Sequence, residues 1–420
     1  MYQQLLAVLR CPFCSARLSL LENYTHVSSC GRLESGVLGC DCCTFPVVAG
    51  IPVMVADDQT REVIKALKVG RRDQALFMLL GLDEIRADAF RSLLARGARA
   101  TYREAIAILS PNAEGAYFVY RFSDPSYLSA EELLQDLGQS RRSVAARSLD
   151  LCGGSGHLTR VLSGLRSVGK EERAGPHPVL ADLYFWKLWL AKRFTSPECA
   201  PVCCDANQPL PFSREAFSMV VLADAFPYIW QKRLLADEMM RLTDPDGVVV
   251  MPHLHSALGE NISAGDTLTP SAYRNLFAPR QPRLFSDERL LADLIERRGI
   301  DLTRDSSSAE LGDESSLTLI ASRQSELFRR YRVQDVRDVD GELKVNPLYR
   351  VERRAGRSIL TLVFPTAEYE EEFFECRRYL PDTITLSADL SGQIVPSTLG
   401  LDYEELRRRR ILIDAPLHYC

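Results

Sequence analysis

One stretch limits the folds open to this chain more than any other, SLDLCGGSGHLT at positions 148–159. Its start, Ser148–Leu151, has the leucine spacing of a short buried strand. Gly153, Gly154 and Gly156 follow, and glycines let the backbone turn tightly and approach a ligand closely. From His157 onward the apolar residues recur at helical spacing. A strand, a glycine loop and a helix in this order predict an α/β fold that binds a nucleotide-like ligand at the carboxyl edge of a parallel sheet.

Strand-like and helical segments alternate after this loop, over about residues 146–324. The further strands are expected at 179–182, up to 203–205, at 217–222, at 248–251 and at 317–320. Three of them end in an acid, namely Asp182, Asp205 and Asp224. This alternation predicts a doubly wound sheet with right-handed crossovers.

The residues around the loop indicate which ligand it binds. A dinucleotide fingerprint requires a third glycine where this chain has Thr159. The sequence words are DLCGGSG at 150–156, VLAD at 179–182, CDA at 204–206 with LPF at 210–212, and LTDPDG at 242–247. In this order they resemble the class I S-adenosylmethionine-dependent methyltransferases over about residues 146–255. The resemblance implies a Rossmann-like core of seven strands, and it departs from the family at Cys152, where the first glycine usually stands.

The resemblance also implies roles for individual residues. Gly154 and Gly156 would lie along S-adenosylmethionine, and Asp150 would order its methionine end. Asp182 would accept hydrogen bonds from the ribose hydroxyls, while Asp205 and the backbone of Ala206 would bind the adenine. The neighbours Cys152, Gly153, Leu183 and Ala223 are predicted to belong to the same cofactor site. The alternative for Asp182 and Asp205 is that they cap the helices that follow their strands.

Three residues at the ends of the fourth and fifth strands are catalytic candidates: Asp224, His253 and His255. Methyl transfer depends mostly on positioning, and a base is needed only if the acceptor must lose a proton. Histidine titrates in the range that suits this task. Strand alternation predicts that the two rings point to opposite faces, so that one histidine faces the site. The alternatives are structural histidines, or a metal site, which is disfavoured because no carboxylate stands at ligand spacing.

The first 56 residues have the cysteine pattern of a zinc ribbon. Cys11 and Cys14 form one Cys-x-x-Cys, and a second cluster holds Cys40, Cys42 and Cys43. Zinc binds four soft ligands in a tetrahedron, which two facing cysteine turns can supply. Spacing alone leaves Cys42 and Cys43 open as the fourth ligand. The words LRCPFC and FPVVAGIPV resemble the Trm112-like zinc ribbon at the head of some bacterial methyltransferases, and that resemblance favours Cys42. We expect the zinc to be structural, or the ribbon to be a docking surface.

Two further regions flank the core. Residues 57–145 have helical periodicity and are expected to form a linker or a lid. Within them Arg121 lies in an aromatic-rich segment. It could bind a carboxylate of the cofactor or substrate, or it could belong to an aromatic plug between domains. Residues 325–420 are predicted to be an accessory α+β domain that walls the acceptor pocket or forms a homodimer interface. The arginine run 407–410 is typical of a solvated helix end.

Charge and composition indicate which kinds of partner and compartment to expect. The net charge of −5 argues against nucleic acid as a partner. No apolar run has the length of a membrane span, and twelve cysteines in a chain without a signal peptide are expected to be reduced, which predicts a cytoplasmic protein. The resulting hypothesis is O- or N-methylation of a small molecule such as a sugar or a natural product. The alternatives are a tRNA or protein methyltransferase that docks through the ribbon, and a non-catalytic binding protein with this fold.

Overall fold

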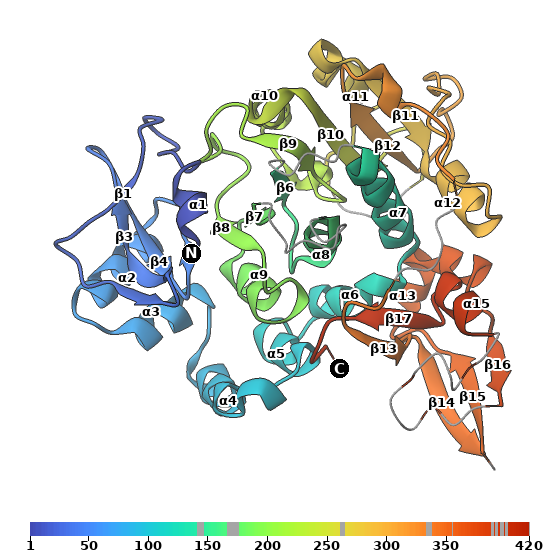
Figure 1. Cartoon of the computed structure of the whole chain (residues 1–420), viewed down its shortest axis with the longest axis horizontal. Coiled ribbons are helices and arrows are strands. Elements are labelled where there is room, and N and C mark those ends of the chain that lie inside the picture. The colour runs from blue at the N-terminus through green and yellow to red at the C-terminus, as the bar shows by residue number, and fades with distance from the viewer. Residues whose placement is uncertain are drawn as a thin grey trace.

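The protein is described from a computed structural model of the whole chain, drawn in Figure 1. The described residues are 1–140, 147–165, 176–260, 265–332, 338–354, 356–387, 390, 394, 399 and 402–419.

A seven-stranded sheet forms the centre of the molecule (Figure 1). Its strands lie in the order β8 (Ala200–Cys203), β7 (Val179–Asp182), β6 (Ser148–Leu151), β9 (Phe217–Val221), β10 (Thr243–His255), β12 (Ser316–Ala321) and β11 (Pro282–Ser286). The strands from β8 to β10 are parallel, whereas β12 runs antiparallel to both of its neighbours. Numbered along the chain, the order is 3-2-1-4-5-7-6 with only the seventh strand reversed. The seven-stranded Rossmann-like core predicted from the sequence is confirmed.

Burial on both faces explains why these strands have continuous apolar sequences. All four residues of β7 and of β8 are buried, as expected of parallel strands covered by helices. The helices are α7 (Pro125–Ser140), α8 (His157–Gly164), α9 (Phe185–Leu190), α10 (Lys232–Leu242), α11 (Pro270–Leu276) and α12 (Asp287–Ile295). The core consists of two apolar clusters, and each takes in residues of the strands. Because β6, β7, β8 and β9 are parallel, their carboxyl ends, which carry the acids, lie at one edge of the sheet.

The N-terminal unit is a small sheet that extends the central one. It contains α1 (Gln3–Leu6), β1 (Ser19–Leu20), β2 (Val27–Ser29), β3 (Arg32–Gly39), β4 (Thr44–Val48) and β5 (Ile51–Pro52). Directly after β5, Val53 forms a parallel bridge with Cys203 of β8. The N–H of Met54 donates to the carbonyl of Cys203 at 2.7 Å. The ribbon thus covers the β8 edge, whose unpaired backbone groups would otherwise invite intermolecular pairing.

Helices connect this unit to the core, as the periodicity predicted. They are α2 (Asp58–Lys68), α3 (Arg72–Leu79), α4 (Glu84–Ala95), α5 (Tyr102–Leu109) and α6 (Ala113–Tyr120). Polar side chains cap their starts: Thr101 and Glu104 form a capping box on α5, and Asn112 accepts from the N–H of Gly115 on α6. After α6, the short η2 (Arg121–Ser123) leads into α7. In the described part of the chain, none of the helices has the length and apolar character needed to cross a membrane.

The C-terminal unit is a small α+β structure. Its elements are β13 (Glu342–Val345), β14 (Tyr349–Arg354), β15 (Arg357–Leu362), α13 (Ala367–Glu372), η8 (Phe374–Arg378), β16 (Thr383–Leu386), α15 (Tyr403–Arg408) and β17 (Leu412–Ala415). After β17 the chain returns to the core, where the buried hydroxyl of Tyr419 lies 3.1 Å from Nε2 of His157. In the arginine run, Arg409 pairs with Glu405 at 2.7 Å and Arg410 pairs with Glu131. The Arg409–Glu405 pair is about half exposed, whereas Arg410 is largely buried rather than solvated.

Candidate active site and metal centres

The glycine loop after β6 has the conformation that glycine favours. Gly154 and Gly156 have φ of +57° and +80°, and Cys152 has φ of +56°. A non-glycine residue in this left-handed region costs roughly 1–2 kcal/mol. Cys152 stands where the family usually has a glycine, so the structure supplies the physical reason for that preference. A Cβ on Gly154 would lie 2.7 Å from the ring of Phe118 on α6, which shows how closely this helix covers the loop.

Asp150 is fully buried beneath the loop. Its Oδ2 accepts from the hydroxyl of Thr159, whereas its Oδ1 has no hydrogen-bond partner among the described residues. Burial raises the pKa of Asp150 to about 7. An unpaired, buried carboxylate oxygen is costly, and a donor from a bound ligand would relieve that cost.

Asp182 ends β7 opposite the glycine loop. Its two oxygens accept from the N–H of Gly154 at 3.0 Å and from the N–H of Tyr184 at 2.9 Å. It therefore holds the turn before α9, but it is not the cap of that helix, because the N-cap position is Tyr184 and no side chain caps it. A carboxylate can accept about four hydrogen bonds, so lone pairs remain for two ligand hydroxyls. Burial raises the pKa of Asp182.

The remaining residues predicted to bind the cofactor lie around the next strand ends. Asp205 follows β8, and its Oδ1 accepts from the backbone N–H of Asn207 at 2.8 Å. Ala206 is buried, Ala223 after β9 is half-buried, and Leu183 exposes 43% of its surface. Leu183, exposed next to Asp182, is suited to form an apolar wall of a ligand site.

Arg121 is paired within the protein. It is buried in η2, and its guanidinium donates to Asp124 at 3.1 Å and to Ser126 at 2.7 Å. Its Cζ lies 5.2 Å from the centre of the Tyr117 ring. The carboxylate partner is thus supplied by the chain itself. These contacts fit the alternative of an aromatic plug, and cofactor binding by Arg121 stays a prediction.

Asp224, His253 and His255 come together at the ends of β9 and β10. Nε2 of His255 lies 3.1 Å from Oδ1 of Asp224, and the two imidazole ring centres are 5.0 Å apart. The prediction that the rings point to opposite faces is wrong. The register of β10 against β12 shifts between Met251 and Leu254, and His253 has φ of +57°. This β-bulge breaks the alternation and brings both rings to one side.

Two further residues complete this cluster, and sequence reasoning missed both. Nδ1 of His253 lies 3.0 Å from Asp287, the first residue of α12. The hydroxyl of Tyr117, on α6, donates to Oδ2 of Asp224 at 2.9 Å. The sequence has no obvious carboxylate at ligand spacing from these histidines, yet the structure brings Asp224 and Asp287 next to them. Carboxylates distant in sequence reach them through the fold, and no spacing pattern could reveal that.

Electrostatics in the cluster lower the pKa of Asp224 and raise the pKa of His253. Burial opposes ionisation of Asp224, but the hydrogen bond from His255 and the nearby positive charges outweigh it and lower its pKa to about 2. Burial also disfavours charge on His253, yet its hydrogen bond to Asp287 outweighs that effect and raises its pKa.

A cavity of about 230 Å³ opens beside these histidines. Its acidic lining residues are Glu260, Asp287, Glu372 and Glu375. Ser126, Ser129 and Phe373 contribute hydroxyls and an apolar surface. The cavity is thus polar, acidic and smaller than the roughly 300–1,000 Å³ of drug-sized ligand sites.

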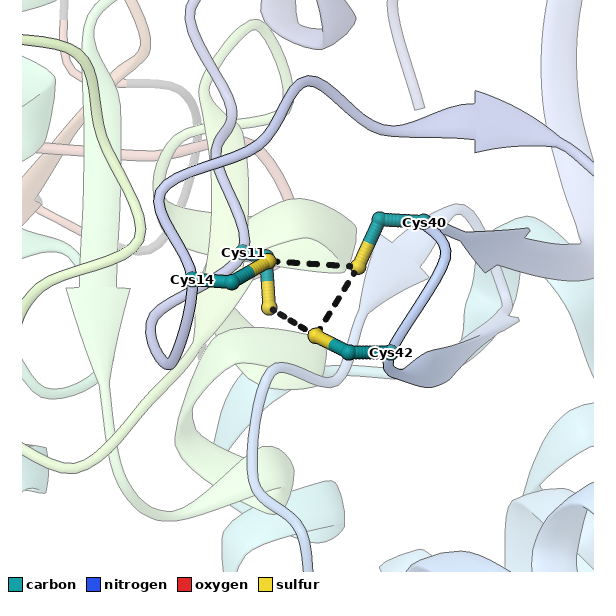
Figure 2. A group of neighbouring side chains, drawn as sticks. All are labelled: Cys11, Cys14, Cys40 and Cys42. Atoms are coloured by element: carbon teal, nitrogen blue, oxygen red, sulfur yellow. Dashed lines mark hydrogen bonds between the residues drawn. The ribbon is translucent and has the colours of Figure 1, made fainter.

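The ribbon cysteines meet at a second centre, shown in Figure 2. The sulfurs of Cys11, Cys14, Cys40 and Cys42 all lie within 4.8 Å of one another and point toward a common centre. The separations are 3.8 Å for Cys11–Cys42, 3.7 Å for Cys14–Cys40 and 3.5 Å for Cys40–Cys42. A tetrahedron with zinc–sulfur bonds of about 2.3 Å has edges of about 3.8 Å. The four sulfurs therefore fit zinc, and Cys43, 3.5 Å from Cys42, lies outside this group.

The comparisons with known proteins concern the fold. No protein-family model matches the chain, and no curated protein matches its sequence. Similar solved structures include SAM-dependent methyltransferases from Thermotoga maritima (11% identity, 50% of this chain and 94% of that chain, TM-score 0.33) and Aquifex aeolicus (13%, 49% and 97%, TM-score 0.31). A chain of the complex between the Haloferax volcanii Trm112 methyltransferase activator and its methyltransferase is also similar (16%, 49% and 93%, TM-score 0.34).

The strand order of the central sheet, with its single reversed strand, decides the fold. It is the fold of the class I methyltransferases. Three of the motifs that suggested this family, DLCGGSG, VLAD and CDA, lie at the carboxyl ends of β6, β7 and β8, whereas LTDPDG lies at the end of α10 and the start of β10.

Proposed function

We propose that the protein transfers a methyl group from S-adenosylmethionine to a small molecule. The observation that carries this proposal is the convergence of the glycine loop, Asp182 and the Asp224–histidine cluster on one edge of a sheet with this strand order. In open α/β sheets, ligands bind at this edge. When bound, S-adenosylmethionine supplies a methyl group activated by its sulfonium.

The residues of this chain fit that cofactor. The unpartnered Oδ1 of Asp150 is an acceptor for the methionine end, and Asp182 retains lone pairs for the ribose hydroxyls. Leu183 and the loop around Asp205 would enclose the adenine. Phe118 packs on the glycine loop and would exclude water from it.

The acceptor is proposed to occupy the cavity beside His253. Its volume of about 230 Å³ suits a small molecule better than a nucleotide within RNA or a folded protein. The ribbon is proposed to hold zinc and to stabilise the β8 edge, since its last residues are already paired with Cys203. A tRNA or protein acceptor that docks through the ribbon is the second candidate. The resemblance of the ribbon's cysteine motifs to Trm112-like zinc ribbons favours it.

Calorimetric titration with S-adenosylmethionine tests the cofactor assignment. We expect binding to the wild type and at least tenfold weaker binding to Asp182→Ala, because each hydrogen bond to a charged group contributes about 1.5–3 kcal/mol. Asp266→Ala, which removes an exposed carboxylate outside the glycine loop, is the control and should bind like the wild type. A wild type that does not bind, or equal affinity in Asp182→Ala, would refute the proposal.

A further inference from the structure

The cluster of Asp224, His253 and His255 has the geometry of a metal site. One ligand atom from each residue lies within 4.8 Å of the other two. Nε2 of His255 and Oδ1 of Asp224 are 3.1 Å apart. Two ligands bound about 2.1 Å from one ion at a right angle are separated by about 3.0 Å. The observed separation, which is that of a hydrogen bond, also fits two adjacent ligands of one ion.

The residues behind the cluster hold its ligand atoms in place. Asp287 accepts from Nδ1 of His253, which leaves Nε2 of that ring for an ion. Tyr117 donates to Oδ2 of Asp224, and an ion would take the place of the proton between Oδ1 and Nε2 of His255. Thr318 in turn donates to Asp287 at 2.6 Å. Metal-binding histidines commonly donate their second N–H to a carboxylate in this way, which fixes the ring orientation.

Backbone strain points to the same residues. Asp224 and His253 both have left-handed φ, +61° and +57°, although neither is glycine. Such conformations persist where the surrounding structure enforces them, and they concentrate at functional sites. Here they turn two ligands from neighbouring strands toward each other.

The charge of the cavity also suits a cation. Four carboxylates line it, with His253 and His255, and the opposing positive charge is the buried Arg121, which already pairs with Asp124. Carboxylate and imidazole ligands suit ions such as Mn²⁺ and Fe²⁺, whereas thiolates select zinc. The two centres in this chain therefore differ in metal preference.

We propose that Asp224, His253 and His255 bind a divalent first-row transition ion of the Mn²⁺ class, with open positions toward the cavity. If the proposed methyl transfer holds, an acceptor hydroxyl would complete the ion's shell, because a hard ion favours oxygen ligands. The acceptor class is then an alcohol or phenol, and the methylated atom is oxygen.

Titration of the zinc-loaded full chain with Mn²⁺, followed by electron paramagnetic resonance of the free ion, tests this site. We expect one Mn²⁺ per wild-type chain. His255→Ala should bind at least tenfold more weakly, and Asp287→Asn should lose 10–100-fold in affinity through the outer shell. His26→Ala, which removes an exposed histidine of the ribbon, should bind like the wild type.

Calorimetry with S-adenosylmethionine on the same samples separates this inference from the proposed function. Cofactor binding without Mn²⁺ binding to the wild type would overturn the metal site alone. Mn²⁺ binding without cofactor binding would refute the methyltransferase proposal and retain the metal site. Equal Mn²⁺ affinity in the wild type and His255→Ala would also overturn the site, with thermal unfolding curves showing that each variant is folded.

Discussion

Replacing Cys42 with serine is expected to release zinc from the ribbon and to unfold the N-terminal unit, whereas Cys43→Ser should do neither. Cys42 lies 3.5–3.8 Å from Cys40 and Cys11, the separations that a tetrahedral site requires. Structural zinc contributes about 10–16 kcal/mol in small zinc-binding peptides. A unit of some 56 residues has too small a core to offset such a loss easily.

The measurement is zinc per chain by elemental analysis, together with limited proteolysis of residues 1–56. Cys42→Ser should lose one zinc per chain relative to the wild type and become susceptible to cleavage. Cys43→Ser is a matched control, because it removes a neighbouring thiol of the same cluster. The ligand set is wrong if Cys42→Ser keeps its zinc or if Cys43→Ser loses as much.

Much of the fold could be predicted because its determinants are local. The glycine loop, the apolar strands and the acids at their ends are each readable within a few residues. The attachment of the ribbon to the sheet is different. The pairing of Val53 with Cys203 joins residues 150 positions apart, and both segments are ordinary apolar strands in sequence. Nothing in either segment indicates its partner.

In the candidate site too, local features could be predicted and long-range contacts could not. The acids and histidines were found from their positions at strand ends, but their mutual arrangement was not. A β-bulge at His253 reverses the expected alternation, and a bulge leaves no signature in the alternation of apolar residues. Asp287 was missed because it starts a helix 34 residues after His253, where an acid reads as a favourable first-turn residue. Asp124 follows Arg121 by three residues, but the sequence does not show that the two side chains pair in a buried site.

Replacing Asp124 with alanine is expected to destabilise the protein by about 3–5 kcal/mol, since it leaves the buried Arg121 without its charge partner. Asp124 is fully buried 3.1 Å from that guanidinium. Its other oxygen accepts from the hydroxyl of Tyr369 in the C-terminal unit. The free energy of unfolding, from urea titration monitored by circular dichroism, gives the magnitude.

Two further variants separate the charge from the hydrogen bond. Tyr369→Phe removes only the hydroxyl, which donates to a charged carboxylate, so it should cost about 1.5–3 kcal/mol. Arg121→Met combined with Asp124→Leu removes both charges and should recover most of the lost stability, because apolar side chains of similar volume often replace a buried ion pair without loss. If Asp124→Ala costs no more than Tyr369→Phe, Arg121 is not held by this pair. If the double variant is no more stable than Asp124→Ala, the loss arises from packing rather than from an unpaired charge.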